Sequence, residues 1–247
     1  MGLTACIYTK NNEHVVEEAL RSVRFADEVI LLDSGSTDRT VEIGRALADR
    51  VEFRAWTGFC DQLNHIPTLA SHEWILIVDA DERVTEALAR EIREAVAQAG
   101  STVAFDLPRL TLYMGRWLRH GEFYPDYTLR LYRKGCGRYE GEPHAKLVPS
   151  GPTRPLREPL EHHMQRHLGD QLDTMRRYSE SQAREMAKGG VKRARLRALI
   201  HPLQRFIKGY VIKGGFLDGW PGFVAAATAS FHVFLKYVRV EEMSGEC

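Results

Sequence analysis

The chain has 247 residues, of which 44% are hydrophobic and 27% charged, and its formal net charge is only +1. This composition allows a well-buried core and excludes a wholly disordered chain, while the near-neutral charge excludes a protein that binds polyanions over its whole surface. The four cysteines are widely spaced, which favours reduced thiols over a disulfide framework or a cysteine zinc site.

We expect neither a signal peptide nor a transmembrane helix. The first residues lack the apolar run of a signal peptide, and no stretch reaches the ~18 uncharged apolar residues that span a bilayer. The last apolar segment, residues 223–238, is short and predicts a packing or interfacial helix. These features predict a cytoplasmic protein.

Apolar strands and amphipathic helices alternate along the chain up to Gly100. The expected strands are residues 3–8, 28–33, 51–56 and 74–78, and the expected helices are residues 11–24, 40–47, 62–70 and 82–99. This alternation predicts an α/β fold with a mostly parallel sheet flanked by helices. In such folds, ligands bind beyond the carboxyl ends of the strands.

Beyond Gly100 the pattern changes. Residues 103–113 have the pattern of a strand, and residues 115–138 mix aromatic and basic side chains. Prolines crowd residues 149–159, which predicts an ordered turn or a linker. From Gln171 the pattern is helical and strongly basic.

These changes suggest a division of the chain into two parts. We expect an α/β domain over residues 1–150, with a nucleotide-binding half up to about residue 100 and an acceptor-binding half from 101 to 150. Residues 151–247 would form a linker and a basic α-helical C-terminal extension.

Two carboxylates, Asp79 and Asp81, directly follow the apolar run 74–78. At a strand end they can face one crevice, and hard oxygen ligands suit Mg²⁺ or Mn²⁺. A divalent cation there would stabilise the charge that develops on a diphosphate leaving group. Helix-capping acids are the alternative for so short a motif, but its place after the strand favours a metal site.

A second polar turn, with the sequence Asp33-Ser34-Gly35-Ser36-Thr37-Asp38, ends the expected strand 28–33. An acid at this position can accept hydrogen bonds from a nucleobase or a ribose hydroxyl. Gly35 allows the backbone to turn tightly. A generic cap between a strand and a helix is the alternative interpretation.

A third polar loop follows the first strand and reads Thr9-Lys10-Asn11-Asn12-Glu13. It can frame a nucleotide with backbone and side-chain groups. It lacks the glycine patterns of dinucleotide-binding proteins and of P-loops, which disfavours NAD and ATP folds. Lys10 also fits an ordinary surface lysine.

Together, these three loops resemble the family 2 glycosyltransferases, which are inverting enzymes of the GT-A fold. The chain carries the loops in the family's order, at residues 9–13, 33–38 and 79–81. Further segments resemble the bacterial lipopolysaccharide inner-core β-glucosyltransferases that act on heptose. They include Gly115-Arg116-Trp117-Leu118-Arg119-His120-Gly121, Tyr124-Pro125-Asp126 and Arg130-Leu131-Tyr132-Arg133.

The resemblance implies a UDP-sugar donor, with UDP-glucose favoured, a lipopolysaccharide-core or other glycolipid acceptor, and Mg²⁺ or Mn²⁺ as cofactor. It implies that Asp33 contacts the uracil, Asp79 the ribose or the metal, and Asp81 the metal. Gln62 and Asn64 would lie near the nucleotide, and Arg130 near the diphosphate. The remaining expected donor-binding residues are Thr9, Asn12, Glu13, Ser34, Gly35 and Asp38.

One departure from the family concerns the catalytic base. Relatives often carry a glutamate where this chain has Ala145. Inversion needs a carboxylate that deprotonates the acceptor hydroxyl. Asp126 is the first candidate and Glu142 the second, although either can instead be a surface acid or a partner of Arg130 or Arg133.

The segment after Gly115 also suits an acceptor groove, because sugars stack on aromatic rings and Arg binds phosphorylated sugars. The residues concerned are Trp117, Arg119, His120, Phe123 and Tyr124. Core packing is the alternative for Trp117 and Phe123. The nearby cluster Glu161-His162-His163, with His167, is interpreted as surface histidines and not as a metal site.

The C-terminal extension is basic and interleaved with aromatic residues, which suits docking on an anionic membrane surface. Its cations are Arg176, Arg177, Arg184, Lys188, Lys192, Arg193, Arg195, Arg197, Arg205, Lys208 and Lys213. A solvated helix face or a homo-oligomer contact is the alternative.

Three other functions are alternatives to the transferase. A nucleic-acid-binding module would use the basic helices, but it leaves the three N-terminal loops without a role. A catalytically impaired UDP-sugar binder is suggested by Ala145. A nucleotidyltransferase would need a glycine-rich phosphate loop after the first strand, which the sequence lacks.

Overall fold

The computed structural model describes residues 2–142, 145–164, 168–191 and 193–244. The chain forms two compact units. The sheet unit comprises Met1–Leu110 and Asp126–His163, and the helical unit comprises Thr111–Pro125 and Met164–Cys247. This division differs from the expected boundary at residue 150, because residues 151–163 group with the sheet and residues 111–125 group with the C-terminal helices.

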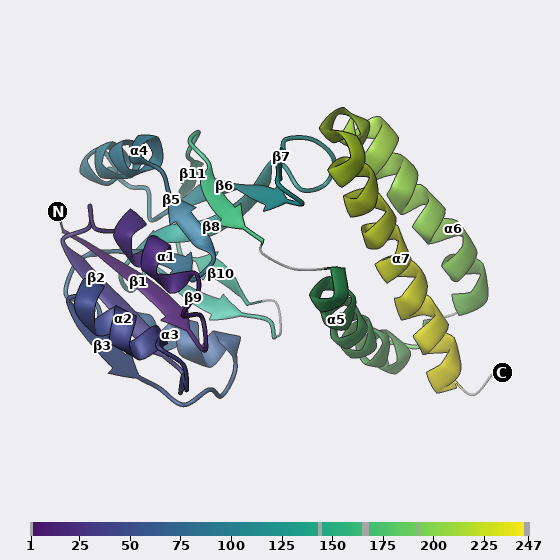
Figure 1. Ribbon diagram of the computed structural model, residues 1–247, viewed down its shortest axis with the longest axis horizontal. Helices are drawn as coiled ribbons and strands as arrows, with labels where there is room; N and C mark the ends of the chain where they lie inside the picture. Colours follow the sequence, from purple (N-terminus) through teal and green to yellow (C-terminus); the bar gives the residue numbers. More distant parts are fainter. Residues whose placement is uncertain (1, 143–144, 165–167, 192, 245–247) are drawn as a thin grey trace. The chain divides into compact units, whose positions relative to one another are not determined.

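The sheet unit alternates strands and helices in its first half and is mainly strands in its second half (Figure 1). Its elements are β1 (Leu3–Thr9), α1 (Val16–Ser22), β2 (Glu28–Asp33), α2 (Thr40–Leu47), β3 (Arg50–Phe53), α3 (Phe59–Leu69), β4 (Trp74–Asp79), β5 (Glu82–Val84), α4 (Glu86–Ala97), β6 (Ala104–Tyr113, which continues into the helical unit), β8 (Asp126–Arg133), β9 (Gly137–Glu140), β10 (Lys146–Pro149), β11 (Thr153–Pro155) and β12 (Leu160–His163).

The main sheet has the strand order β3-β2-β1-β4-β8-β6-β12-β5. Strands β3, β2, β1 and β4 are parallel, and β8 runs antiparallel to both β4 and β6. Helices α1, α2 and α4 pack on one face through a first apolar cluster, and α3 packs on the other face through a second. The predicted α/β class, a largely parallel sheet flanked by helices, is therefore confirmed.

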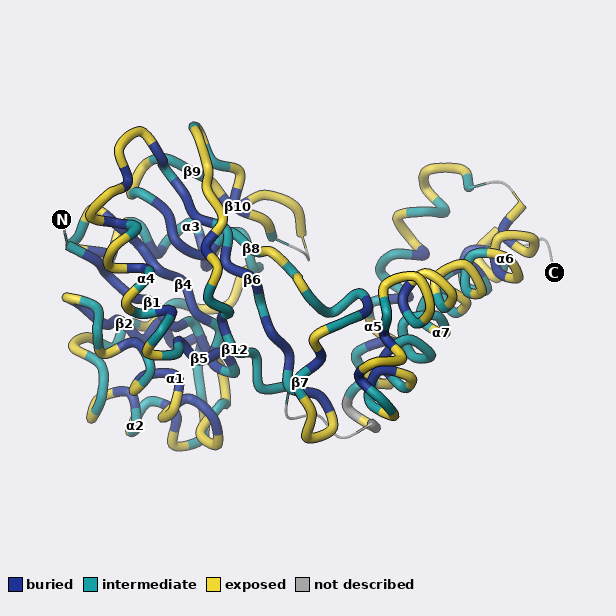
Figure 2. Tube along the Cα trace, turned by 90° about the horizontal axis from the view of Figure 1, so that it is seen from above, coloured by how far each residue is buried: buried dark blue, intermediate teal, exposed yellow. Residues whose placement is uncertain are grey.

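The central strands are apolar on both faces because both faces are covered. Every residue of β2 is buried, and β1 and β4 are buried over nearly their whole length, as Figure 2 shows. The side chains alternate between the two clusters, with Ile7 and Leu31 in the first and Cys6 and Ile30 in the second. The buried apolar runs of β2 and β4 end at the acids Asp33 and Asp79.

Strand pairing changes one expected helix boundary and decides how the proline-rich segment folds. The expected helix 82–99 begins only at Glu86, where Thr85 caps it by accepting a hydrogen bond from the Leu88 amide, and residues 82–84 form β5. The proline-rich segment 149–159, expected as an ordered turn or a linker, is ordered and contains β11, which pairs with β6. Long-range strand pairing decides both outcomes.

The helical unit contains β7 (Arg116–Leu118), α5 (Leu168–Lys188), α6 (Ala194–Phe206), the π-helical turn η1 (Ile207–Ile212), the 3₁₀ turn η2 (Gly215–Asp218) and α7 (Gly219–Ser244). Helix α7 packs against both α5 and α6 (Figure 1). It is 26 residues long, whereas the sequence predicted an apolar segment of about 16 residues. By length and composition alone, the helical stretch Gly215–Ser244 could cross a membrane.

Candidate functional site

Three parallel strands bring the expected loops to one edge of the sheet. In the strand register, Thr9 of β1 pairs with Asp33 of β2, and Tyr8 pairs with Asp79 of β4. Neighbouring strands lie about 4.8 Å apart, so the three loops are adjacent in space. The predicted convergence of Asp33 and the Asp79–Asp81 pair on one edge is therefore present.

An open crevice of about 220 Å³ lies at this edge. It is lined by the ends of β1 and β4, the turn after β2 and the loop after β3. The lining residues are Tyr8, Thr9, Lys10, Asn12, Ser34, Trp56, Asp79, Ala80 and Asp81. Polar groups thus surround an opening that two aromatic residues, Tyr8 and Trp56, also line.

Asn12 fixes the shape of the loop after β1. Its side-chain amide donates to Thr9 Oγ1 at 2.8 Å and to the carbonyl of Lys10 at 3.1 Å, and its backbone amide donates to Thr40 Oγ1. The loop is therefore anchored to the start of α2, with Thr9, Lys10 and Asn12 all at the crevice wall.

Glu13 and Asp38 each accept a hydrogen bond from a backbone amide in the other's loop. The Glu13 amide donates to Asp38 Oδ2 at 3.1 Å, and the Arg39 amide donates to Glu13 Oε2 at 2.9 Å. Asp38 also accepts from the Thr40 amide, and these hydrogen bonds lower the pKa of Asp38 against the effect of desolvation. Both carboxylates hold the loops together.

Asp33 is nearly fully buried and shapes its own turn. Its Oδ2 accepts from the amides of Gly35 at 2.9 Å and Ser36 at 3.0 Å, and its Oδ1 accepts from the Ser36 hydroxyl. Gly35 has φ +91°, a conformation that side chains disfavour. The turn presents Ser34 to the crevice, whereas the Asp33 oxygens are engaged by its own loop.

Gln62 and Asn64 also bind backbone groups and do not line the crevice. The buried Gln62 amide donates to the carbonyls of Arg54 and Ala55, just before Trp56. Asn64 makes two hydrogen bonds to the backbone of Tyr139. Gln62 thus stabilises the loop that carries Trp56, and Asn64 connects α3 to β9 through hydrogen bonds.

Asp79 is one end of a chain of paired charges. Arg130 Nη2 lies 2.5 Å from Asp79 Oδ2 and 3.2 Å from Glu82 Oε1. Glu82 is fully buried, and its Oε2 accepts from the Asp79 amide at 2.9 Å. Burial raises the pKa of Glu82, and the charges of Arg130 and Arg109 oppose that rise.

A local irregularity in strand pairing places Arg130. Phe105 of β6 pairs with Leu131 of β8, but the next residue, Asp106, pairs with Leu129, so Arg130 is an extra residue on β8. Such bulges redirect a side chain. The guanidinium is almost fully buried and contacts Asp79 at the crevice.

Asp126 continues the same chain of charges at the start of β8. Its Oδ2 lies 2.6 Å from Arg109 Nη2, and Arg109 Nη1 lies 3.7 Å from Glu82 Oε1. The partner of Asp126 is thus Arg109, and not Arg130 or Arg133. The Asp126 side chain remains 43% exposed, which leaves it accessible to a substrate.

Glu142, the second candidate base, binds the start of α3. Its Oε1 accepts from the Cys60 amide at 2.6 Å. An acid at a helix N-terminus is stabilised by the free amides and the helix dipole. This contact gives Glu142 a structural role that Asp126 does not share.

Asp81 has a neighbour that the sequence did not reveal. Strand β12 pairs with β5, and this pairing brings His162 Nε2 to 3.4 Å from Asp81 Oδ2. The His162 side chain is only 14% exposed, so its interpretation as a surface histidine was wrong. His167, grouped with it in the sequence, lies outside the described residues.

Oxygen and imidazole nitrogen donors side by side fit a divalent cation. Within the described parts of the chain, no group of three or more His, Cys, Asp or Glu could hold a metal ion. A cation bound at Asp81 and His162 would therefore need ligands from a substrate, as is usual for Mg²⁺ held between carboxylates and phosphates.

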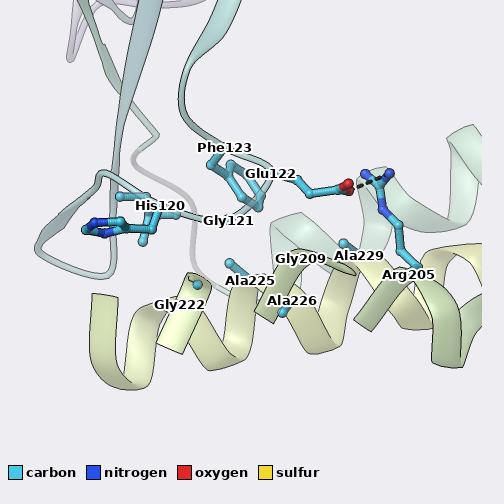
Figure 3. A pocket seen from close by; sticks show the side chains of 12 residues that line it. His120, Gly121, Glu122, Phe123, Arg205, Gly209, Gly222, Ala225, Ala226 and Ala229 are labelled. Atoms are coloured by element: carbon cyan, nitrogen blue, oxygen red, sulfur yellow. Dashed lines mark ion pairs between the residues drawn. The ribbon is translucent and has the colours of Figure 1, made fainter. Parts of the chain in front are cut away.

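The helical unit has a cavity of its own (Figure 3). It offers only about 20 Å³, roughly the room of one water molecule, and therefore excludes a sugar. Of the expected acceptor residues, His120 and Phe123 line it. His120 is bound by Asp218, with its Nδ1 2.9 Å from Asp218 Oδ1, and Phe123 stacks near Tyr113.

The residues that the sequence analysis missed share one property. Arg109, Glu82 and His162 each contact a charged residue from a segment distant along the chain. Glu82 stands next to the Asp79–Asp81 motif, and this position was the one local signal of its involvement. Nothing local distinguishes Arg109 in its strand.

Comparison with known proteins identifies relatives over almost the whole chain. Residues 4–155 match the family model described as Glycosyl transferase family 2. An uncharacterized glycosyltransferase of Rickettsia bellii is 29% identical over 258 residues, covering 99% of this chain and 88% of the relative. The lipopolysaccharide core biosynthesis glycosyltransferase LpsC of Rhizobium meliloti is 28% identical, covering 97% of this chain and 92% of the relative.

A more distant likeness exists among solved structures. The glucosyl-3-phosphoglycerate synthase of Mycobacterium tuberculosis, in complex with Mg²⁺ and uridine diphosphate, is 20% identical with a TM-score of 0.38. The similarity covers 46% of this chain and 44% of that chain, so it is limited to less than half of either protein.

Proposed function

This chain belongs to glycosyl transferase family 2, and from that premise we propose that it transfers a hexose, with glucose favoured, from a UDP-sugar to a lipopolysaccharide-core or other glycolipid acceptor. The observation that carries the proposal is the crevice where the loops after β1, β2 and β4 meet around Asp79 and Asp81. The acceptor class is supported by the similarity to LpsC.

The nucleotide half of the donor would occupy the part of the crevice between β1 and β2. Thr9, Asn12 and Ser34 offer hydroxyl and amide groups for ribose or base, and Trp56 offers a face for stacking. Lys10 is a cation at the same wall and suits a phosphate. Asp33, Glu13 and Asp38 act by fixing these loops.

Asp81 and His162 would hold a divalent cation, with Asp79 beside them. The imidazole nitrogen makes a transition-metal ion such as Mn²⁺ a better match than Mg²⁺, which prefers oxygen ligands. When bound, the cation would neutralise charge on the leaving diphosphate.

The acceptor hydroxyl needs a base on the face opposite the leaving group, and Asp126 is the candidate that the geometry favours. Its Oδ2 is held by Arg109, which leaves Oδ1 to accept the hydroxyl proton as the oxygen attacks the anomeric carbon. Arg109 fixes the orientation of the carboxylate, and the buried Glu82 fixes Arg109. Transfer would therefore invert the anomeric centre.

The donor class can be tested by thermal unfolding with UDP, ADP and GDP, each with and without Mn²⁺. We expect a rise in Tm that is selective for UDP and requires the metal. Equal shifts with all three nucleotides, or a shift independent of metal, would contradict the proposed donor site.

The reaction can be tested by measuring UDP release from UDP-glucose in the presence of lipopolysaccharide core. We expect release that depends on the acceptor. Binding of UDP without turnover would instead favour the impaired binder suggested by Ala145. A lipid-linked acceptor would also require the enzyme at the inner face of the cytoplasmic membrane.

A further inference from the structure

Helix α6 exposes its large apolar side chains and buries its small ones. Ala194 and Ala198 are buried, whereas Leu196, Leu199 and Leu203 are 48%, 71% and 60% exposed. The leucines recur every three or four residues and so share one helix face, which the exposed Ile200 and Ile207 complete. A helix of a water-soluble protein normally shows the reverse pattern, so this face needs a partner.

The turns that follow α6 extend this apolar surface. Val211, Ile212, Phe216, Leu217 and Trp220 are all more than half exposed, and we call these five residues the apolar tip. Ring contacts connect the segments that carry them. The centroids of Tyr210 and Phe216 are 6.3 Å apart, and those of Trp220 and Phe223 are 5.3 Å apart.

The same segments carry a strong excess of positive charge. The sequence has no Asp or Glu between Glu185 and Asp218, but it contains Arg193, Arg195, Arg197, Arg205, Lys208 and Lys213. Glu122, in the same unit, is a single carboxylate that faces Arg205, Lys208 and Lys213, and its pairing with Arg205 is drawn in Figure 3. One carboxylate against three cations leaves net positive charge beside the apolar tip.

We propose that the exposed face of α6 and the apolar tip insert into the surface of an anionic phospholipid bilayer, with the helices lying in the plane of the membrane. Apolar side chains would enter the acyl boundary, and the flanking Arg and Lys would bind lipid phosphates. Arg195 is paired with Glu241, but the segment as a whole keeps an excess of positive charge. This combination of exposed leucines, aromatic rings and excess positive charge is what an anionic membrane surface complements.

The contacts of α7 favour this arrangement over a helix that spans the bilayer. Thr228 of α7 is hydrogen-bonded to Gln171 of α5, and the Ser230 hydroxyl donates to the Pro202 carbonyl of α6 at 2.7 Å. Arg239 donates to the Arg176 carbonyl of α5. Helix α7 is thus bound by polar contacts on both flanks, and a span across lipid would require these contacts to break.

A second copy of the chain is a poorer partner for the same surface. A symmetric contact would place the same cations of two copies against each other, and like charges across an interface are unfavourable. An anionic bilayer presents lipid phosphates to these cations, so the interaction is attractive where a symmetric contact would be repulsive.

The proposal refines the membrane contact suggested above, but its test does not depend on transfer activity. The full-length protein is sedimented with vesicles of phosphatidylcholine and phosphatidylglycerol, and separately with vesicles of phosphatidylcholine alone. We expect binding to the anionic vesicles that weakens as salt is raised, and much weaker binding to the neutral ones. Equal binding to both vesicles, or none to either, would overturn the proposal.

Substitutions locate the surface. Leu203→Ser combined with Trp220→Ser should weaken vesicle binding by at least about tenfold, because two large apolar side chains no longer enter the bilayer. Leu172→Ser, an exposed leucine on α5, is the matched control and should bind like the wild type. If the double variant and Leu172→Ser lost vesicle binding equally, the membrane contact would not lie on α6 and the apolar tip, and the proposal would be contradicted.

Three further measurements separate this proposal from its alternatives. The double variant should keep the Tm of the wild type and its UDP-dependent stabilisation, so that a failed donor site and a failed membrane face give different results. Extraction with alkaline carbonate should release the wild-type protein, whereas resistance would indicate a span and overturn the in-plane arrangement. A dimer in solution that the double variant disperses would assign the face to a second copy.

Discussion

Arg109 Nη2 lies 2.6 Å from Oδ2 of Asp126. The same guanidinium approaches the buried Glu82, which also pairs with Arg130, and Arg130 in turn pairs with Asp79. Opposite charges therefore alternate from the proposed base to the acid at the proposed metal site. Because buried charges are costly unless paired, this arrangement constrains the positions of both terminal carboxylates.

Replacing Asp126 by Asn should test the proposed base. We expect kcat to fall about 10²- to 10⁴-fold with little change in UDP binding, because the amide cannot accept the hydroxyl proton. Steady-state transfer kinetics and UDP-dependent thermal shifts measure the two effects. Glu142→Gln is the matched control, and a larger loss in that variant would make Glu142 the base.

Replacing Asp81 by Ala should remove metal-dependent donor binding. We expect the Mn²⁺-dependent Tm shift with UDP to vanish and turnover to fall by about 10²-fold or more, because the leaving diphosphate loses its counter-charge. Glu94→Ala, at an exposed site on α4, should behave as the wild type. Wild-type turnover in Asp81→Ala would argue strongly against the proposed metal site.

Replacing Glu82 by Gln should destabilise the protein. The change leaves Arg109 and Arg130 without their shared counter-charge, and breaking a buried pair in this way costs about 3–5 kcal/mol. Urea unfolding measures the loss, with the exposed Glu86→Gln as a control that should change stability by less than about 0.5 kcal/mol. A loss below about 1 kcal/mol would show that Glu82 is already protonated in the folded protein.

Glu28 should make stability depend on pH in the acid range. Burial alone raises its pKa, but hydrogen bonds from Ser71 and Thr4 and the contact with Arg50 lower the pKa from 4.5 to about 2. Because the folded pKa is depressed, the stabilisation is present above about pH 4.5 and is lost as the pH falls toward 2. When the Glu28 carboxylate is fully ionised, this pKa shift contributes about 3 kcal/mol to the free energy of unfolding.

Urea unfolding of the wild type and Glu28→Gln checks this dependence. The stability difference between them should be smaller by about 2 kcal/mol at about pH 3 than at about pH 6. A difference that stays constant over this range would mean that the carboxylate is not selectively stabilised in the folded state.

The strand ends and the loops of the site could be predicted from sequence, because these features are encoded locally. Apolar runs such as Val29–Leu32 specify strands buried on both faces, and an acid such as Asp33 or Asp79 marks the end of the run. Parallel strands place all their carboxyl ends at one edge, so the crevice follows from the order of the elements.

The roles of individual side chains could not be predicted in this way. Glu13 and Asp38 bind each other's loops, and Gln62 and Asn64 bind backbone, because the nearest free amide or carbonyl in the folded chain satisfies them. The residue type determines which hydrogen bonds a side chain can form. The groups that surround it in the folded chain determine which of these hydrogen bonds are present.

The order of strands and helices, the three polar loops and the family could be read from the sequence, since each depends on residues close together along the chain. The pairing of β12 with β5, the resulting contact of His162 with Asp81 and the grouping of residues 111–125 with the C-terminal helices became visible only in the folded chain. These outcomes join segments distant in sequence, and such pairings are selected by the packing of the whole chain and carry no local pattern.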